Sequence, residues 1–63
     1  MDEEKFNMSL RKFLKQVGVT SQQQIENAVR ASGKSSGTIA FKMVLSSGTL
    51  GLEHVVEGEI ELD

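Results

Sequence analysis

Strict alternation of side-chain character near the C-terminus constrains this chain more than any other feature. From Leu50 to Leu62 the even positions are apolar residues, His54 or Gly58, whereas the odd positions are Gly51, Val55 and four glutamates. A period of two is the signature of a β-strand with one buried face and one solvated face, which is acidic here. At about 3.3 Å per residue the strand would be roughly 43 Å long. A chain of 63 residues is too short to cover it alone, so the pattern predicts a partner.

A shorter alternating segment precedes this strand. Residues 38–45 place Ile39, Phe41, Met43 and Leu45 on one face, and residues 46–49 have the composition of a hairpin turn. A tight turn at residues 57–58 would instead give a three-strand meander, but it would split the apolar residues between two faces. The parity therefore favours one continuous strand with a bend or bulge at the glycine, although the residues leave the turn open as an alternative.

The first half of the chain has helical periodicity. Five apolar residues spaced i, i+4, i+7, i+8 and i+11 predict a helix from Glu3 to about Val17, capped by Gly18: they are Phe6, Leu10, Phe13, Leu14 and Val17. A capping box at Thr20–Gln23 or Ser21–Gln24 predicts a second helix to about Ser32, ended by Gly33, and residues 33–37 form a flexible link.

The predicted fold is therefore α+β: two N-terminal helices followed by an antiparallel β-hairpin with a long C-terminal strand. Residues 1–63 form a single domain, because a chain of this length holds one small core. The apolar faces of these elements predict a buried core made of Phe6, Leu10, Phe13, Leu14, Ile25, Val29, Ile39, Phe41, Met43, Leu52 and Ile60.

Composition argues against several kinds of chemistry. The chain has no Cys and one His, which excludes disulfides, thiolate metal sites and cysteine nucleophiles and leaves no ligand set for zinc. Gly33-Lys34-Ser35 is a fragment of a phosphate-binding loop, but it follows a helix, and Ala28 stands where the motif needs a glycine. We expect no catalytic residue, no cofactor and no metal, and hence no enzyme.

The distribution of charge and hydropathy restricts partners and location. Residues 1–34 carry six basic and four acidic side chains, and residues 35–63 carry one basic and five acidic side chains. No apolar run could span a membrane, and the acidic start does not resemble a signal peptide, so we expect a cytoplasmic protein. The alternative function is a small nucleic-acid-associated regulator that uses the helical pair as a helix-turn-helix. An acidic hairpin in the position of the wing argues against it.

Two segments are similar in sequence to a known family. They are residues 6–21 (FNMSLRKFLKQVGVTS) and residues 51–60 (GLEHVVEGEI). Together they resemble a small bacterial family of uncharacterised proteins, known mainly from alphaproteobacteria and classed as a domain of unknown function. The resemblance implies a small cytoplasmic α+β protein. It implies no activity and transfers no site residue.

These observations predict a homodimeric interaction or structural module rather than a catalyst. Small domains without disulfides or metals are commonly stabilised by oligomerisation, and an unpaired length of strand recruits another strand. The expected dimer interface is the apolar face of the last strand, formed by Leu52, His54, Val56, Ile60 and Leu62. The loose link at residues 33–37 would allow the two chains to exchange hairpins, and the sequence leaves exchange and side-by-side pairing open.

Overall fold

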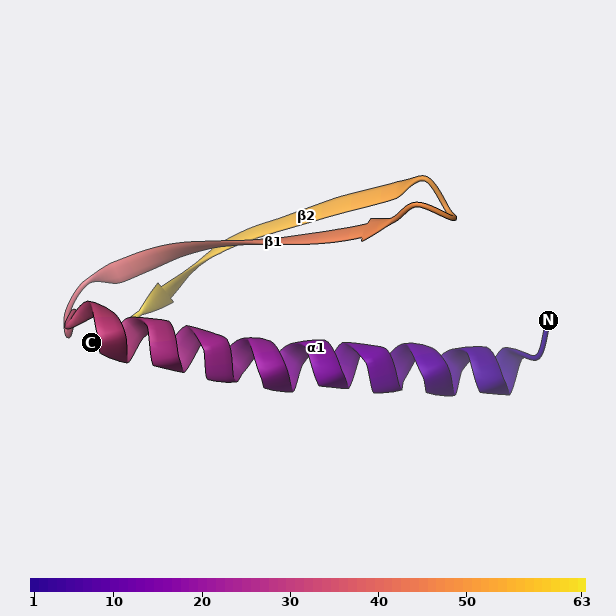
Figure 1. The fold of residues 1–63 in the computed structure, drawn as a ribbon, viewed down its shortest axis with the longest axis horizontal. Helices are drawn as coiled ribbons and strands as arrows, with labels where there is room; N and C mark the ends of the chain where they lie inside the picture. Colours follow the sequence, from indigo (N-terminus) through magenta and orange to yellow (C-terminus); the bar gives the residue numbers. More distant parts are fainter.

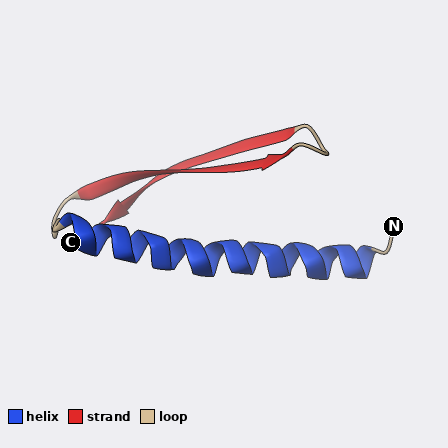
Figure 2. Ribbon diagram, viewed as in Figure 1, coloured by secondary structure: helices blue, strands red, loops and turns tan.

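One long helix and one β-hairpin make up the whole chain in the computed structural model, which describes residues 1–63 (Figures 1 and 2). Helix α1 spans Glu3–Ser32, strand β1 spans Thr38–Ser47 and strand β2 spans Leu52–Glu61. The hairpin folds back over the helix, so that β1 starts beside the C-terminal end of α1 and the hairpin turn points towards its N-terminal end (Figure 1). The resulting particle is elongated, at 47 × 21 × 17 Å.

The prediction of two N-terminal helices is wrong, because α1 continues without interruption through Gly18. Thr20, one of the two residues expected to cap a second helix, instead donates its hydroxyl to the Gln16 carbonyl one turn earlier, at 2.8 Å. A mid-helix glycine costs only about 0.5–1 kcal/mol relative to alanine, and the chain has no proline to break the helix. The helical face that carries Val17 also stays in phase across the glycine, because Val17, Ser21 and Ile25 are spaced by four residues and the apolar stripe resumes at Ile25.

Both ends of α1 form as the sequence predicts. The Asp2 carboxylate accepts hydrogen bonds from the backbone N–H groups of Glu4 and Lys5, each at 3.1 Å, which satisfies two of the free donors of the first turn. Gly33 ends the helix with φ 74°, and its N–H donates to the Arg30 carbonyl at 3.3 Å. A left-handed cap of this kind favours glycine because it has no Cβ.

The hairpin differs from the prediction in strand length. β1 and β2 have ten residues each and pair antiparallel along their whole length, from Thr38 opposite Glu61 to Ser47 opposite Leu52. The turn is therefore residues 48–51 rather than 46–49, and Gly51 takes the positive φ of 61° in it. The expected thirteen-residue strand with an unpaired end is wrong. Leu62 donates its N–H to the Gly37 carbonyl at 2.9 Å, which ties the end of the chain to the start of β1.

Strand β2 runs through Glu57 and Gly58 without a turn, as the parity of the sequence predicts, and Gly58 lies opposite Phe41. The three-strand meander is thereby excluded. Cross-strand partners share a face, so the register defines two faces. The inner face turns towards α1 and consists of Ile39, Phe41, Met43, Leu45 and Ser47 with Leu52, His54, Val56, Gly58 and Ile60. The outer face consists of Thr38, Ala40, Lys42, Val44 and Ser46 with Glu53, Val55, Glu57, Glu59 and Glu61.

The predicted buried core does not form within one chain, because none of the 63 residues is buried. Phe13 and Leu14 are 49% and 52% exposed. The side chains that reach half-burial are Val17, Ser21, Ile25, Val29, Ile39, Phe41, Ser47 and Leu62. Except for Ser47, they belong to the half of the molecule nearest the link between helix and hairpin. The prediction fails because one helix covers only one face of the two-stranded sheet. The two sides of the space between helix and hairpin stay open to solvent.

Candidate functional site

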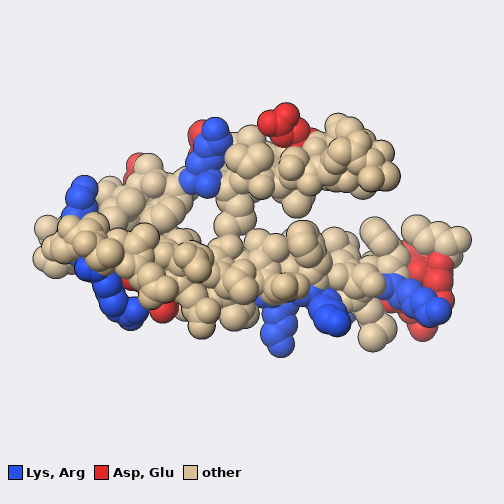
Figure 3. Space-filling view, in the orientation of Figure 1, with Lys and Arg blue, Asp and Glu red and all other residues tan.

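The main concave feature is a groove between the helix and the inner face of the hairpin. Near the link it is lined by Ala28, Val29, Ile39 and Phe41. Farther along, Ile25, Phe41, Met43, Val56 and Ile60 are among its lining residues, and towards the turn its lining includes Phe13, Leu14, Val17, Leu45 and His54. Figure 3 shows the groove as a slit between two lobes, bridged by side chains part-way along its length.

The lining of the groove is mainly apolar and offers little chemistry. Ser21 and Gln24 lie on the helical side near Gly58, and His54 lies opposite Leu45 on the hairpin side. No carboxylate lines the part of the groove that contains His54. No group of three or more His, Cys, Asp or Glu side chains could hold a metal ion. The groove is therefore an apolar surface with few polar side chains.

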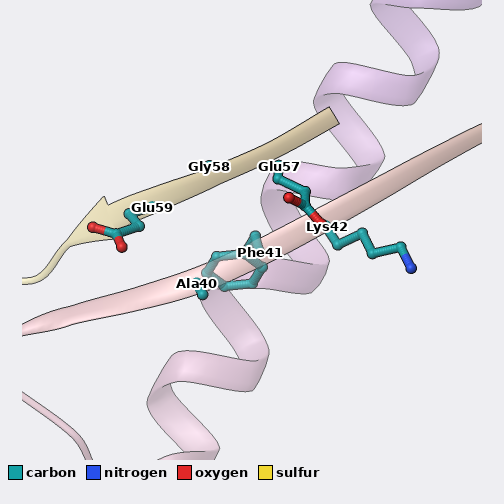
Figure 4. A pocket seen from close by; sticks show the side chains of 6 residues that line it. All are labelled: Ala40, Phe41, Lys42, Glu57, Gly58 and Glu59. Atoms are coloured by element: carbon teal, nitrogen blue, oxygen red, sulfur yellow. The ribbon is translucent and has the colours of Figure 1, made fainter. Parts of the chain in front are cut away.

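A second depression lies on the hairpin around Gly58 (Figure 4). Ala40, which has only a methyl group, and Phe41 line it with Gly58. Lys42, Glu57 and Glu59 also line it, and the Lys42 side chain extends away from the glycine. Its charged groups are all exposed, so water competes for any ligand.

Charged side chains are concentrated on the outsides of the two layers. Figure 3 shows lysines and arginines along the side of α1 that faces away from the hairpin, and acidic side chains on the far side of the hairpin. The register places Glu53, Glu57, Glu59 and Glu61 together on the outer face of the sheet, with Lys42 opposite Glu57. Charges are thus excluded from most of the groove, as expected of surfaces that meet in an apolar interior.

The structure places the residues predicted for a dimer interface as follows. Leu52, His54, Val56 and Ile60 share the inner face of β2, as the alternation predicts. Leu62 follows the strand and is half-buried beside Gly37. Their role in dimerisation stays a prediction. His54, Val56 and Ile60 line the groove, and all three lie in the paired part of β2.

Sequence reasoning missed the helical side of the groove between Val17 and Ile25. Ser21 is one of the two helix caps that the sequence predicts, whereas in the structure it is half-buried and lines the groove with Gln24. The signal was available, because positions 17, 21 and 25 are spaced by four residues and fall on one helical face. The single helix also removes the helix-turn-helix alternative, because that module needs a second helix and α1 is the only one.

Comparison with known proteins gives one family. The sequence model of a family of unknown function, DUF6494, matches residues 1–63. No curated protein and no solved structure shows detectable similarity. The match confirms the resemblance to a domain of unknown function, and the bacterial group in which the family occurs stays an expectation. No helix combines the length and the apolarity needed to cross a membrane.

Proposed function

The chain belongs to the family of unknown function DUF6494, and from its uncovered apolar faces we propose that it is a homodimeric structural or interaction module. In this proposal a second copy covers the groove and completes the core. The module is not an enzyme. A cytoplasmic location is part of the same proposal and is supported by the sequence composition, in which no disulfide can form.

The observation that carries the proposal is the absence of any buried residue. A single chain exposes 5723 Å², whereas a compact protein of 6.9 kDa is expected to expose only about 4,000 Å². Its radius of gyration is 15.4 Å, against roughly 11 Å for a compact chain of this length. Folding alone thus covers roughly two-fifths of the surface of the extended chain, where about three-fifths is usual at this size.

The excess surface has the size of a dimer interface. Each chain exposes about 1,700 Å² more accessible surface than a compact chain of its mass. If dimerisation buried this excess in both chains, the interface would cover roughly 3,400 Å² in total. Obligate homodimer interfaces span about 2,000–5,000 Å². The exposed large side chains include Phe6, Leu10, Phe13, Leu14 and Leu52, and such residues predominate in interfaces that resemble a domain core cut in half.

Sedimentation equilibrium of the full chain tests the proposal. We expect a single species with twice the 6.9 kDa mass of the chain at concentrations near 100 μM and well below. A monodisperse monomer at about 100 μM would contradict the proposal, because even a micromolar affinity gives mostly dimer at that concentration.

A further inference from the structure

Both edges of the sheet are free. The sheet has only two strands, β1 and β2, and they are paired with each other along their whole length. Each strand therefore presents one edge on which alternate residues direct their backbone N–H and C=O groups outwards. An edge of this kind is a template for pairing with another strand. Of all the exposed features of the molecule, these edges specify the geometry of a partner most closely.

The width of the sheet indicates how many strands are missing. Neighbouring strands lie about 4.8 Å apart, so a two-stranded hairpin is roughly 10 Å wide. A helix with its side chains is about 10–12 Å across, so one helix spans the hairpin and nothing closes either flank of the groove. A four-stranded sheet would be roughly 19 Å wide and would carry two helices side by side. Each helix would then close one flank of its neighbour.

We propose that a second copy of the chain adds to the free edge of β1. The product is a continuous four-stranded antiparallel sheet with the strand order β2-β1-β1-β2, covered on one face by the two α1 helices. This inference rests on the proposed homodimer and specifies its geometry. It holds whichever of the two hairpins each helix covers, because the strand pairing is the same in both cases.

The charge pattern favours β1 over β2 as the pairing edge. The outer face of β2 carries Glu53, Glu57, Glu59 and Glu61, whereas the outer face of β1 carries a single charge, on Lys42. Two-fold pairing of β2 with its copy about either central residue places glutamates directly opposite glutamates. With Val56 on the axis, Glu53 of each copy lies opposite Glu59 of the other copy. With Glu57 on the axis, Glu57 faces its own copy. Like charges directly opposite destabilise a strand pair.

The register of the β1 pair follows from its two faces. In a two-fold antiparallel pair, the residue numbers of any two facing residues add up to the same total. This total must be even, because an odd total would place odd-numbered inner residues opposite even-numbered outer residues. The two inner faces would then lie on opposite sides of the sheet. The two most central solutions place either Lys42 or Met43 on the axis, and each leaves one residue of the strand unpaired. The first sets two ammonium groups directly opposite each other. The second sets Lys42 opposite Val44 and Phe41 opposite Leu45, so the structure favours Met43 on the axis.

Single cysteines test this arrangement, because the chain has none of its own. In Met43→Cys the two thiols would lie opposite each other across the axis, with Cα atoms about 4.5–5.5 Å apart, inside the usual range for a disulfide. The matched control is Val56→Cys, because Val56 lies directly opposite Met43 in the same hairpin and on the same face. Its two copies would be three strand spacings apart, or roughly 14 Å.

After mild oxidation of the folded full chain, we expect Met43→Cys to run largely as a covalent dimer on a non-reducing gel and Val56→Cys to run as a monomer. The reverse result would assign the pairing to β2 and overturn the proposal. A dimer by sedimentation in which neither cysteine cross-links would also overturn the sheet pairing, while leaving the homodimer intact. Open-ended polymers would overturn it in favour of β1 pairing with β2 of the next copy. A monomeric reduced protein would refute the homodimer itself.

Substitution of Met43 could impair folding, so a second pair of variants uses the outer face. Lys42→Cys and Val44→Cys chains, mixed and refolded together, should form mixed disulfides because these positions lie opposite each other in the proposed register. Either variant alone should cross-link poorly, because identical positions are then diagonal and about 7–8 Å apart. Efficient cross-linking of Lys42→Cys alone, with no mixed disulfide between Lys42→Cys and Val44→Cys chains in the mixture, would contradict the register.

Discussion

Replacing Gly18 by alanine tests the uninterrupted helix, because the predicted and the observed folds give opposite signs. In the structure Gly18 lies inside α1, its φ is not positive, and an added Cβ would meet no atom within 4 Å. Alanine should therefore fit without strain and stabilise the folded state. If Gly18 instead capped a short first helix in the left-handed conformation, alanine would be strained there and destabilising.

The size of the effect follows from the helical position. Alanine in place of an unstrained helix-interior glycine is worth about 0.5–1 kcal/mol per chain. For a domain of this size 1 kcal/mol corresponds to roughly 4–8 °C in melting temperature. The expected increase for Gly18→Ala is thus about 2–8 °C, with no loss of helical signal.

The assay is thermal unfolding followed by circular dichroism at a fixed chain concentration. The matched control is Gly33→Ala, because Gly33 has φ 74° and open space around its Cα, so only backbone strain opposes the methyl group. That strain is about 1–2 kcal/mol, and the control should melt at a lower temperature than the parent. A Gly18→Ala variant that melts below the parent, as is expected of the Gly33 variant, would refute the single helix.

Three further substitutions test the groove, the helix start and the outer face. Phe13→Ala should cost about 3–5 kcal/mol per chain in denaturant unfolding if a second copy covers the ring, whereas a ring that stays 49% exposed should lose roughly half as much. Asp2→Ala should lower stability by about 1 kcal/mol through loss of the cap, and Asp2→Asn should retain most of it; equal losses in the two variants would argue against capping. Lys42→Glu should destabilise by less than about 1 kcal/mol, since it faces Glu57 on an exposed surface. Combining it with Glu57→Lys should restore stability, and an effect unchanged at high salt would contradict the electrostatic cause.

The sequence was sufficient to predict the hairpin and its faces. Alternation over residues 39–45 and 52–60 places the same side chains on one face as the observed register does, because only one pairing parity keeps apolar residues together. Gly33 was correctly identified as a helix end, since α1 stops there in the left-handed conformation. These features depend on local backbone geometry and on a period of two, both of which are visible in a single sequence.

Other features depend on competition that the sequence shows only weakly. Gly18 has the residue type of a helix end, but its small cost is outweighed by a helix whose apolar stripe continues from Val17 to Ile25 in phase. Ser46 and Ser47 have the composition of a turn, but they lie in β1 because the turn is placed by the positive φ of Gly51. These outcomes depend on the sum of many small free-energy contributions from residues along the chain.

Burial was the least predictable property, and with it the candidate site. An apolar stripe shows which side chains avoid water, but it does not show how wide the opposing layer is. Phe13 and Leu45 have the pattern of core residues and yet are 49% and 38% exposed, because a single hairpin is only as wide as the helix above it. The groove could therefore be recognised only when the two layers were seen together.

The dependence of the melting temperature on chain concentration tests the central claim, that a second copy completes the core. If folding and dimerisation are coupled, the melting temperature must rise with concentration. Two chains of 63 residues unfold with an entropy of about 265 cal/mol/K near 60 °C, so each tenfold increase should raise the midpoint by roughly 6 °C. Between 1 and 100 μM we expect a rise of about 11–12 °C. A midpoint that stays constant over this range, with native helical signal throughout, would contradict the account.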